Sequence, residues 1–127
     1  SLHVMEDLVA KEPHRTDFLR DLSVSFNNVG NIHQAMGEGR KALEFFEKSL
    51  HVMEDLVAKE PHRTDFRVDL AISCWNMFGI CPQEDELRWL NKAKEILRPI
   101  RDAGLLHGQL EELWGYVEKE LEKRVES

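Results

Sequence analysis

Cysteine is scarce in this sequence, because its 127 residues contain only two, Cys74 and Cys81. Two thiols at this spacing supply neither a disulfide framework nor a four-ligand zinc site. If both lie on one helix, a rise of about 10 Å separates them, which is too far for a disulfide. We therefore expect both to be small, buried, apolar side chains.

Basic residues are also in the minority, and no long apolar run occurs. The chain has 17 lysines and arginines against 24 acidic residues, a formal net charge of -7. This balance disfavours nucleic acid and anionic membrane surfaces as partners, because both need a concentrated basic face. A membrane span would need about 18 consecutive apolar residues, which the sequence lacks. We expect a soluble, cytoplasmic protein.

The start of the chain has neither an initiator methionine nor the basic and then apolar opening of a signal peptide, since it reads SLHVMEDLVA. We therefore expect a piece of a longer protein. The length allows one compact domain or a short stack of repeated units, and it is too short for most two-domain enzymes.

The most informative feature present is an internal repeat. Residues 1–18 read SLHVMEDLVAKEPHRTDF, and residues 49–66 repeat these letters without a change. Weaker matches continue at the same spacing, as between Asp21 and Asp69. Self-similarity at a fixed period of about 20–50 residues is typical of solenoids and repeat arrays. Identity this complete favours a recent duplication, so we expect further copies in a longer parent chain.

Each repeat unit is expected to form two helices. The stretch from Lys41 to Lys59 has apolar residues three and four positions apart, which places them on one helix face. Pro61 ends this helix because proline cannot continue the hydrogen-bond ladder. Thr64 or Asp65 can then cap the next helix, and the same residue types recur at the equivalent place in the first copy.

Helical patterning extends over the whole chain. No segment alternates apolar and polar residues between turn signals, as a half-buried strand would. A glycine of the Gly37-Glu38-Gly39 turn is available for the left-handed residue that closes a helix. The expected fold class is all-α, with helices over residues 1–11, 16–36, 39–60, 64–81, 84–102 and 106–124.

Residues 23–50 carry a pattern of bulky, small and aromatic side chains at fixed offsets along two helices. The pattern runs through Phe26, Val29, Gly30, His33, Ala42, Phe46 and Ser49. It resembles the tetratricopeptide repeat (TPR) family, most closely in ALEFFEKSL at residues 42–50. Its physical basis is packing, because Gly30 and Ala42 allow two helices to approach closely while aromatic rings fill the space beside the contact.

The resemblance implies antiparallel helical hairpins stacked as a right-handed α-solenoid. Two features depart from the family: His33 replaces its usual tyrosine, and the period is 48 rather than about 34. The longer period resembles a bacterial variant of the repeat. On this basis the chain divides into the second half of a truncated repeat (1–15), a complete repeat (16–63), a degenerate repeat (64–104) and a C-terminal capping helix (105–127).

The last two parts follow the pattern less closely. Pro99 lies late in the helix expected over 84–102, so we expect a kink or an early stop there. Trp89 and Trp114 are expected to pack in the core or under the cap. The final helix has the single apolar face that a capping helix needs. That face consists of Leu106, Leu110, Leu113, Val117 and Leu121.

The N-terminal end has no comparable cap. By analogy with their copies in the second unit, Leu2, Met5 and Val9 are expected to pack against a preceding helix that this sequence does not contain. About three repeats are normally needed for stability, and this chain has about two and a half. We therefore expect either self-association into a homo-oligomer through Leu2, Met5 and Val9, or marginal stability.

Residues suited to catalysis or metal binding are few and scattered. His3 with Asp7, together with the copy of this pair 48 residues later, could offer two metal ligands per pair. Both pairs are explained more simply as solvated residues copied by duplication. Ser23, Ser25 and His33 share one expected helix, but no nucleophile elbow or phosphate-binding loop accompanies them. We expect no catalytic site, no metal site and no cofactor.

The resemblance implies that partners bind the concave face lined by the first helix of each hairpin. Asparagine and glutamine can donate to and accept from an extended peptide backbone, and a tryptophan could supply an aromatic anchor. The simpler alternative is that these are ordinary surface residues and a packed tryptophan. The expected groove residues are Val24, Asn27, Asn31, Gln34, Ile72, Trp75 and Gly79.

Two functional hypotheses follow. The leading one is a non-catalytic scaffold for protein–protein interaction that binds a peptide segment or partner protein in the groove. The alternative is a regulatory or sensor segment of a larger enzyme, such as a protease, a kinase or an NTPase. A ligand with a C-terminal carboxylate is disfavoured, because the groove positions are neutral and offer it no counter-charge.

Overall fold

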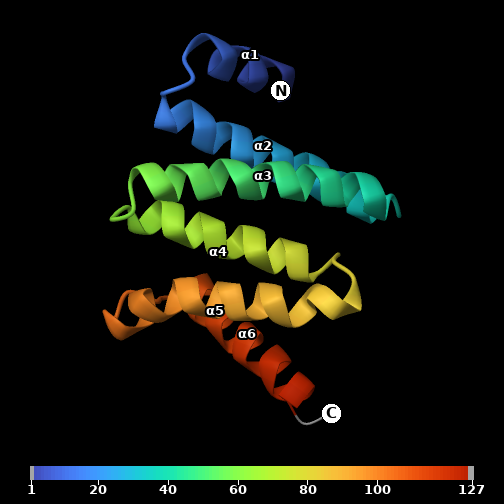
Figure 1. Cartoon of the computed structure of the whole chain (residues 1–127), viewed down its shortest axis with the longest axis vertical. Coiled ribbons are helices and arrows are strands. Elements are labelled where there is room, and N and C mark those ends of the chain that lie inside the picture. Colours follow the sequence, from blue (N-terminus) through green and yellow to red (C-terminus); the bar gives the residue numbers. More distant parts are fainter. Residues whose placement is uncertain (1, 126–127) are drawn as a thin grey trace. The chain divides into compact units, whose positions relative to one another are not determined.

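All the regular secondary structure in the described part of the polypeptide is helical. The structure is a computed structural model that describes residues 2–125. Within that range it has six α-helices, one short 3-10 helix and no β-strand (Figure 1). The expectation of an all-α protein is therefore confirmed. The chain divides into two compact units between His62 and Arg63, and each is described by itself below.

The first unit is built from three helices: α1 (Leu2–Lys11), α2 (Thr16–Ala35) and α3 (Gly39–Lys59). Helices α2 and α3 pack side by side as an antiparallel hairpin, and α1 packs against α2 (Figure 1). The expected apolar face of α3 lies in the core. The buried apolar side chains of this unit are Leu22, Phe26, Ala42, Phe46, Leu50, Met53 and Leu56.

The turn between α2 and α3 uses glycine as predicted. Gly37 has a φ of 76°, a left-handed conformation that side chains with a Cβ rarely adopt. Its N–H donates to the Gln34 carbonyl at 3.1 Å, and the Glu38 N–H donates to the His33 carbonyl at 2.8 Å. These bonds satisfy carbonyls at the C-terminus of α2 and turn the chain directly into α3.

Close approach of α2 and α3 depends on Gly30. A Cβ built on Gly30 would lie 2.7–2.8 Å from two ring atoms of Phe46, closer than real Cβ contacts. Phe46 is only 1% exposed and Ala42 is fully buried, so neighbouring atoms surround the ring. The sequence prediction that a glycine and an alanine bring these helices together is confirmed.

A pair of serines joins the same two helices near the middle of the hairpin. The hydroxyls of Ser23 and Ser49 are 2.7 Å apart, and the Ser49 hydroxyl also donates to the Ser23 carbonyl at 3.1 Å. Both side chains are buried, at 3% and 0% exposure. Because the helices are antiparallel, this contact places the first half of α2 along the second half of α3.

The second unit contains α4 (Thr64–Phe78), a 3-10 helix (Gln83–Asp85), α5 (Glu86–Asp102) and α6 (Gln109–Val125). Helix α4 packs against α5, and α5 packs against α6 (Figure 1). Trp89 and Trp114 are 5% and 8% exposed, which confirms their predicted role in packing. The other buried apolar side chains are Phe66, Leu70, Ala71, Cys74, Met77, Leu90, Ala93, Leu97, Ile100, Leu113 and Val117.

Helix α4 is three residues shorter than the expected range of 64–81. The N–H of Cys81 donates to the Met77 carbonyl at 2.8 Å, which closes the helix after Phe78. Gly79 and Pro82 follow, and both disfavour continuation of a helix. Cys81 consequently lies outside the helix and is half-buried, so the expectation of full burial is confirmed for Cys74 and wrong for Cys81.

The early stop expected at Pro99 does not occur. Helix α5 continues through Pro99 to Asp102. The Pro99 carbonyl accepts a hydrogen bond from the Ala103 N–H at 3.1 Å, and Ile100 is 5% exposed. Proline removes one N–H donor, but burial of Ile100 favours one further helical turn.

The predicted side-chain caps of α2 and α4 are also wrong. The residues preceding these helices are Arg15 and Arg63, in extended conformations, and neither helix has a side-chain capping bond. Instead, Arg15 forms two hydrogen bonds with the Asp17 carboxylate, at 2.9 and 2.6 Å. In the first turn of α2 the Asp17 carboxylate thus meets the Arg15 side chain in addition to nearby backbone N–H groups.

Candidate binding surfaces

The four groove residues predicted on α2 share one side of the helix. Asn31 and Gln34 are exposed, and Val24 is 49% exposed. Asn27 is half-buried. Positions 24, 27, 31 and 34 follow helical spacing and therefore form a strip beside the buried face that meets α3. The strip presents one apolar and three amide side chains.

Asn27 differs from its neighbours on this strip. Its amide oxygen Oδ1 is buried and has no hydrogen-bond partner within the described residues. An unpaired buried polar atom costs free energy, on the order of 1–3 kcal/mol.

On α4, Ile72 is exposed and Trp75 is half-buried, and Gly79, which directly follows the helix, is exposed. The Trp75 ring lies against Phe78, with ring centroids 5.1 Å apart. It also lies against Tyr116 of α6, with centroids 6.3 Å apart and ring planes 24° apart. The predicted aromatic position on α4 therefore belongs to a group of three rings, of which Tyr116 is 55% exposed.

Tyr116 was not predicted as a surface residue of this site. It lies outside the apolar face of α6, and nothing in its local sequence marks it as a neighbour of Trp75. The contact depends on how α6 folds back within the second unit, which requires tertiary structure. One feature of the sequence was an indirect indication, because Tyr116 is a large aromatic residue that lies off the buried face of an otherwise amphipathic helix.

An ion-pair cluster holds the end of α6 in place. Arg124 of α6 donates from Nε to Glu86 of α5 at 2.9 Å and from Nη1 to Glu120 at 2.8 Å. Hydrogen bonding to Arg124 lowers the pKa of Glu120, and the bonds to Glu86 and then Glu120 raise the pKa of Arg124. The Arg124 guanidinium also lies 4.9 Å from the centroid of the Phe78 ring.

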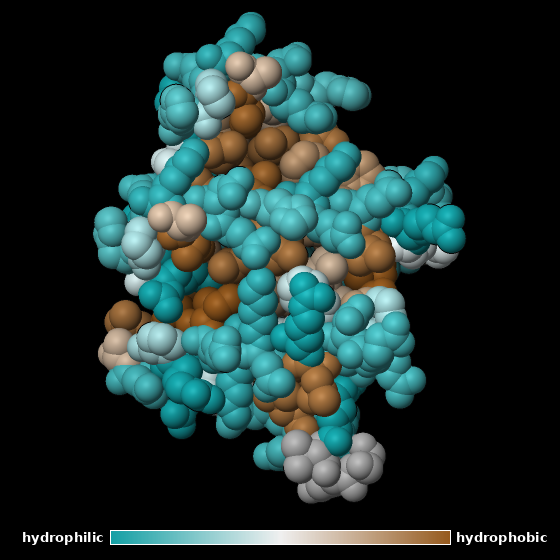
Figure 2. Space-filling model, viewed as in Figure 1, coloured by the Kyte–Doolittle hydropathy of each residue, from teal (hydrophilic) through white to brown (hydrophobic). Residues whose placement is uncertain are grey.

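The proposed self-association residues lie on α1, which has no buried residue. Leu2, Met5 and Val9 are each half-buried. Figure 2 shows apolar side chains open to solvent where α1 meets α2. In the identical second copy, by contrast, Leu50 and Met53 are 3% and 1% exposed. The face of α1 that corresponds to this buried face of α3 is therefore less covered.

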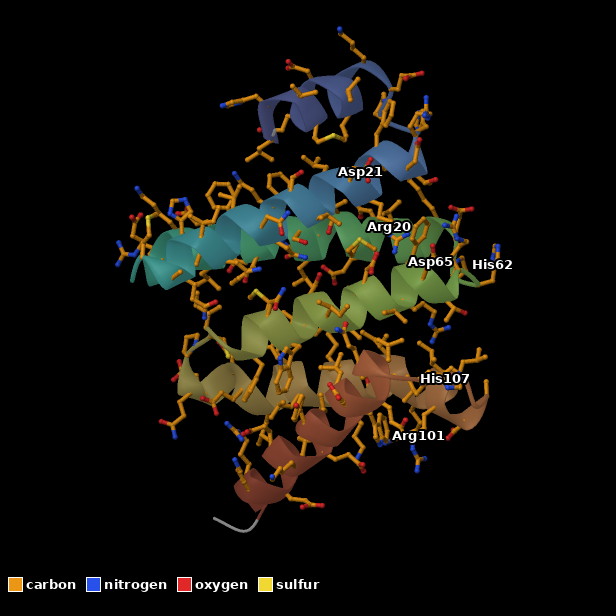
Figure 3. All side chains as sticks on the ribbon, turned by 180° about the vertical axis from the view of Figure 1, so that it is seen from behind. Arg20, Asp21, His62, Asp65, Arg101 and His107 are labelled. Carbon is orange, nitrogen blue, oxygen red and sulfur yellow. The ribbon has the colours of Figure 1, made fainter. Side chains whose placement is uncertain are left out.

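The residues considered for catalysis are engaged in packing or lie in solvent. Ser23 is bonded to Ser49, as described above. The ring of His33 stacks on Phe45, with centroids 5.4 Å apart and planes 5° apart, and its Nδ1 lies 3.1 Å from a Glu38 carboxylate oxygen. His33 therefore packs as an aromatic ring within the first unit. His62 lies in the loop after α3 and points away from the ribbon (Figure 3).

No metal site is found in the described part of the chain. Within it, no group of three or more histidine, cysteine or acidic side chains could hold an ion. The His51 ring pairs with Glu54 at 3.2 Å rather than with Asp55, and His3 lies 4.0 Å from Glu6. Burial, followed by the nearby Glu86 and Asp85 charges, raises the pKa of the Cys81 thiol, which opposes thiolate chemistry there.

A shallow cavity of about 310 Å³ lies between the end of α5 and α6. Arg101, which is labelled in Figure 3, and Trp114 line it together with Glu111 and Glu118. Its charged groups have both signs, and the guanidinium of Arg101 already lies 5.1 Å from the Trp114 ring centroid. The cavity therefore has no free charge of one sign that would select a ligand.

Within residues 2–125, no helix has both the length and the apolar character needed to cross a membrane. The chain matches no protein-family model, no curated protein and no solved structure. What the protein does must therefore follow from its own residues and their geometry.

Proposed function

We propose that this protein is a non-catalytic scaffold for protein–protein interaction, built as a TPR-like right-handed α-solenoid. The observation that supports the function best is the strip on α2, because Val24, Asn27, Asn31 and Gln34 present amide groups and one apolar side chain beside a rigid hairpin. An extended peptide carries unpaired backbone donors and acceptors, which amide side chains can satisfy.

The hairpin and the repeated junction support the solenoid. Gly30 packs against Phe46 as the TPR pattern requires. The sequence that joins α1 to α2 recurs without change between α3 and α4, and its local structure recurs as well. Arg15 lies over the Phe18 ring at 3.9 Å, and Arg63 lies over the Phe66 ring at 4.0 Å. We infer that identical junctions connect successive hairpins.

A display library of random peptides, selected on the immobilised protein, tests the proposed groove. Peptides that enrich should lose binding to the Asn27→Ala/Asn31→Ala variant. Asn91→Ala is the matched control, because Asn91 is an exposed asparagine on α5, outside the strip. Helical circular dichroism should be the same for all three proteins. Equal binding to the double variant, or no enrichment at all, would exclude this function.

We also propose that α1 mediates self-association of the chain. The half-buried side chains of Leu2, Met5 and Val9 belong to a helix without a buried residue, whereas two equivalent side chains in α3 are covered. Sedimentation equilibrium should show a dimer or larger species that Met5→Glu dissociates. The control is His3→Glu, which adds charge to an exposed position of the same helix. A wild-type monomer at all concentrations would contradict this proposal.

A further inference from the structure

Lysine and arginine side chains lie over most of the aromatic rings in this protein. The sequence has six phenylalanines, three tryptophans and one tyrosine. A cationic group lies between 3.9 and 5.8 Å from the centroids of Phe18, Phe26, Phe45, Phe66, Phe78, Trp89 and Trp114. Pairing of a cation with a ring face is thus a recurrent contact of this chain.

Within residues 2–125, the rings without such a cation are Phe46, Trp75 and Tyr116. Phe46 is 1% exposed, so its ring is sealed in the hairpin. Trp75 and Tyr116 are accessible and adjacent, with centroids 6.3 Å apart. They are therefore an accessible aromatic pair to which the described chain contributes no cation.

The charges around this pair are compatible with a positively charged ligand, because Arg124, which lies over the neighbouring Phe78 ring, is paired with Glu86 and Glu120. Residues 70–83, which include Trp75, contain no charged side chain, and the acidic residues Asp69 and Glu84 border them. On α6, Glu112 precedes Tyr116 by one turn, while Lys119 follows it. The whole chain has a formal net charge of -7. This excess of negative charge attracts basic partners and repels acidic ones.

We propose that Trp75 and Tyr116 form a docking site for an arginine side chain in a basic segment of the partner protein. The inference rests on the proposed function, since it requires a protein or peptide ligand, and it adds the chemistry of that ligand. A planar guanidinium stacks on aromatic faces and sheds its hydration more readily than an ammonium. Exposed Ile72, one turn before Trp75, offers apolar surface to the arginine stem.

The test uses a short Gly/Ser peptide that carries several arginines, and a peptide of the same length with glutamate in their place. Binding is followed by two-dimensional NMR of the full chain, through the three tryptophan indole N–H signals. The arginine peptide should shift the Trp75 signal, assigned from Trp75→Leu, more than those of Trp89 and Trp114. The glutamate peptide should produce no shift.

Substitutions then separate ring contact from general charge attraction. Tyr116→Leu and Trp75→Leu should weaken binding about fivefold or more, and Tyr116→Phe should keep most of it, because its ring remains. Tyr116 is 55% exposed, so its replacement leaves the core intact even if Trp75→Leu disturbs folding. Unchanged affinity in Tyr116→Leu would overturn the site. So would equal binding of the glutamate peptide, or no binding of the arginine peptide.

Failure of this inference and failure of the proposed function have different signatures. The α2 strip is tested by library peptides and by Asn27→Ala/Asn31→Ala, in a different unit of the molecule. If those peptides bind through α2 and the arginine peptide leaves the Trp75 signal unmoved, the scaffold function holds and the arginine site is wrong.

Discussion

Residues 2–18 and 50–66 have one sequence and two environments. They share one local contact: in each copy an arginine donates two hydrogen bonds to the carboxylate of the aspartate two residues later. The same arginine lies over the ring of the phenylalanine that follows the aspartate. Their burial differs, because Leu56 is fully buried while its counterpart Leu8 remains half-buried. The local contacts therefore follow from the repeated sequence alone, whereas the burial of its side chains depends on the segments that surround it.

The difference in burial arises from α2, the first helix of the α2/α3 hairpin. In the second copy, α3 begins at Gly39, and the Ser23–Ser49 contact aligns α2 along its second half. In the first copy, α1 packs against α2, but none of the residues of α1 is buried. Because the two copies have equal sequences and unequal environments, a substitution in one copy has an internal control in the other.

Removal of one core side chain should have the largest effect. Leu56→Ala should lower the free energy of unfolding by about 2–5 kcal/mol, since it leaves a cavity at a fully buried position. Leu8→Ala makes the same change in the same sequence and should cost less than half as much. Urea unfolding followed by circular dichroism measures both. Equal losses would mean that the two copies are equally covered.

Separation of α2 from α3 should come next in size. Gly30→Ala forces a Cβ against the Phe46 ring and should cost about 1–3 kcal/mol. Gly115→Ala is the control, because a Cβ at Gly115 meets nothing within 4 Å. That change should stabilise helix α6 by up to about 1 kcal/mol. If Gly30→Ala is also stabilising, the close approach of the two helices is wrong.

Acid should loosen the other end of the chain, where α6 is tied by charge. Bonding to Arg124 lowers the pKa of Glu120, so its contribution to stability is complete above the unfolded-state pKa of about 4.3. That contribution is lost as the pH falls through the lower pKa of the folded state. Glu120→Gln should remove this part of the acid dependence. An identical pH profile for the variant would show that the cluster does not stabilise α6.

The smallest expected effect concerns the local contacts that both copies share. The hydrogen bond from Arg15 lowers the pKa of Asp17 below its ordinary range. An NMR titration should show this shift, and Arg15→Met should return the Asp17 pKa towards its ordinary value with little change in the unfolding midpoint. A normal pKa for Asp17 in the wild type would contradict the local arginine–aspartate pairing.

Patterns of short range predicted most of the fold. The helices, the Gly37 turn and the Gly30–Phe46 contact all depend on periodicity and residue size. Both properties can be read directly from the amino-acid sequence. The arginine pairing at Asp17 and the continuation past Pro99 were missed, since general capping and proline rules ignore the competing local contact. The Trp75–Tyr116 pair was missed because it joins α4 to α6, whose approach no sequence spacing indicates.

Amide hydrogen exchange measured by NMR tests the central claim most directly, because it compares identical residues at two places in one molecule. The account predicts that amides of Glu54–Lys59 exchange much more slowly than the same amides of Glu6–Lys11, which are hydrogen-bonded within a helix in both copies, since hydrogen bonds in a covered helix open less often. Equal protection of the two copies would show that α1 is as well covered as α3, and it would remove the basis for self-association through α1.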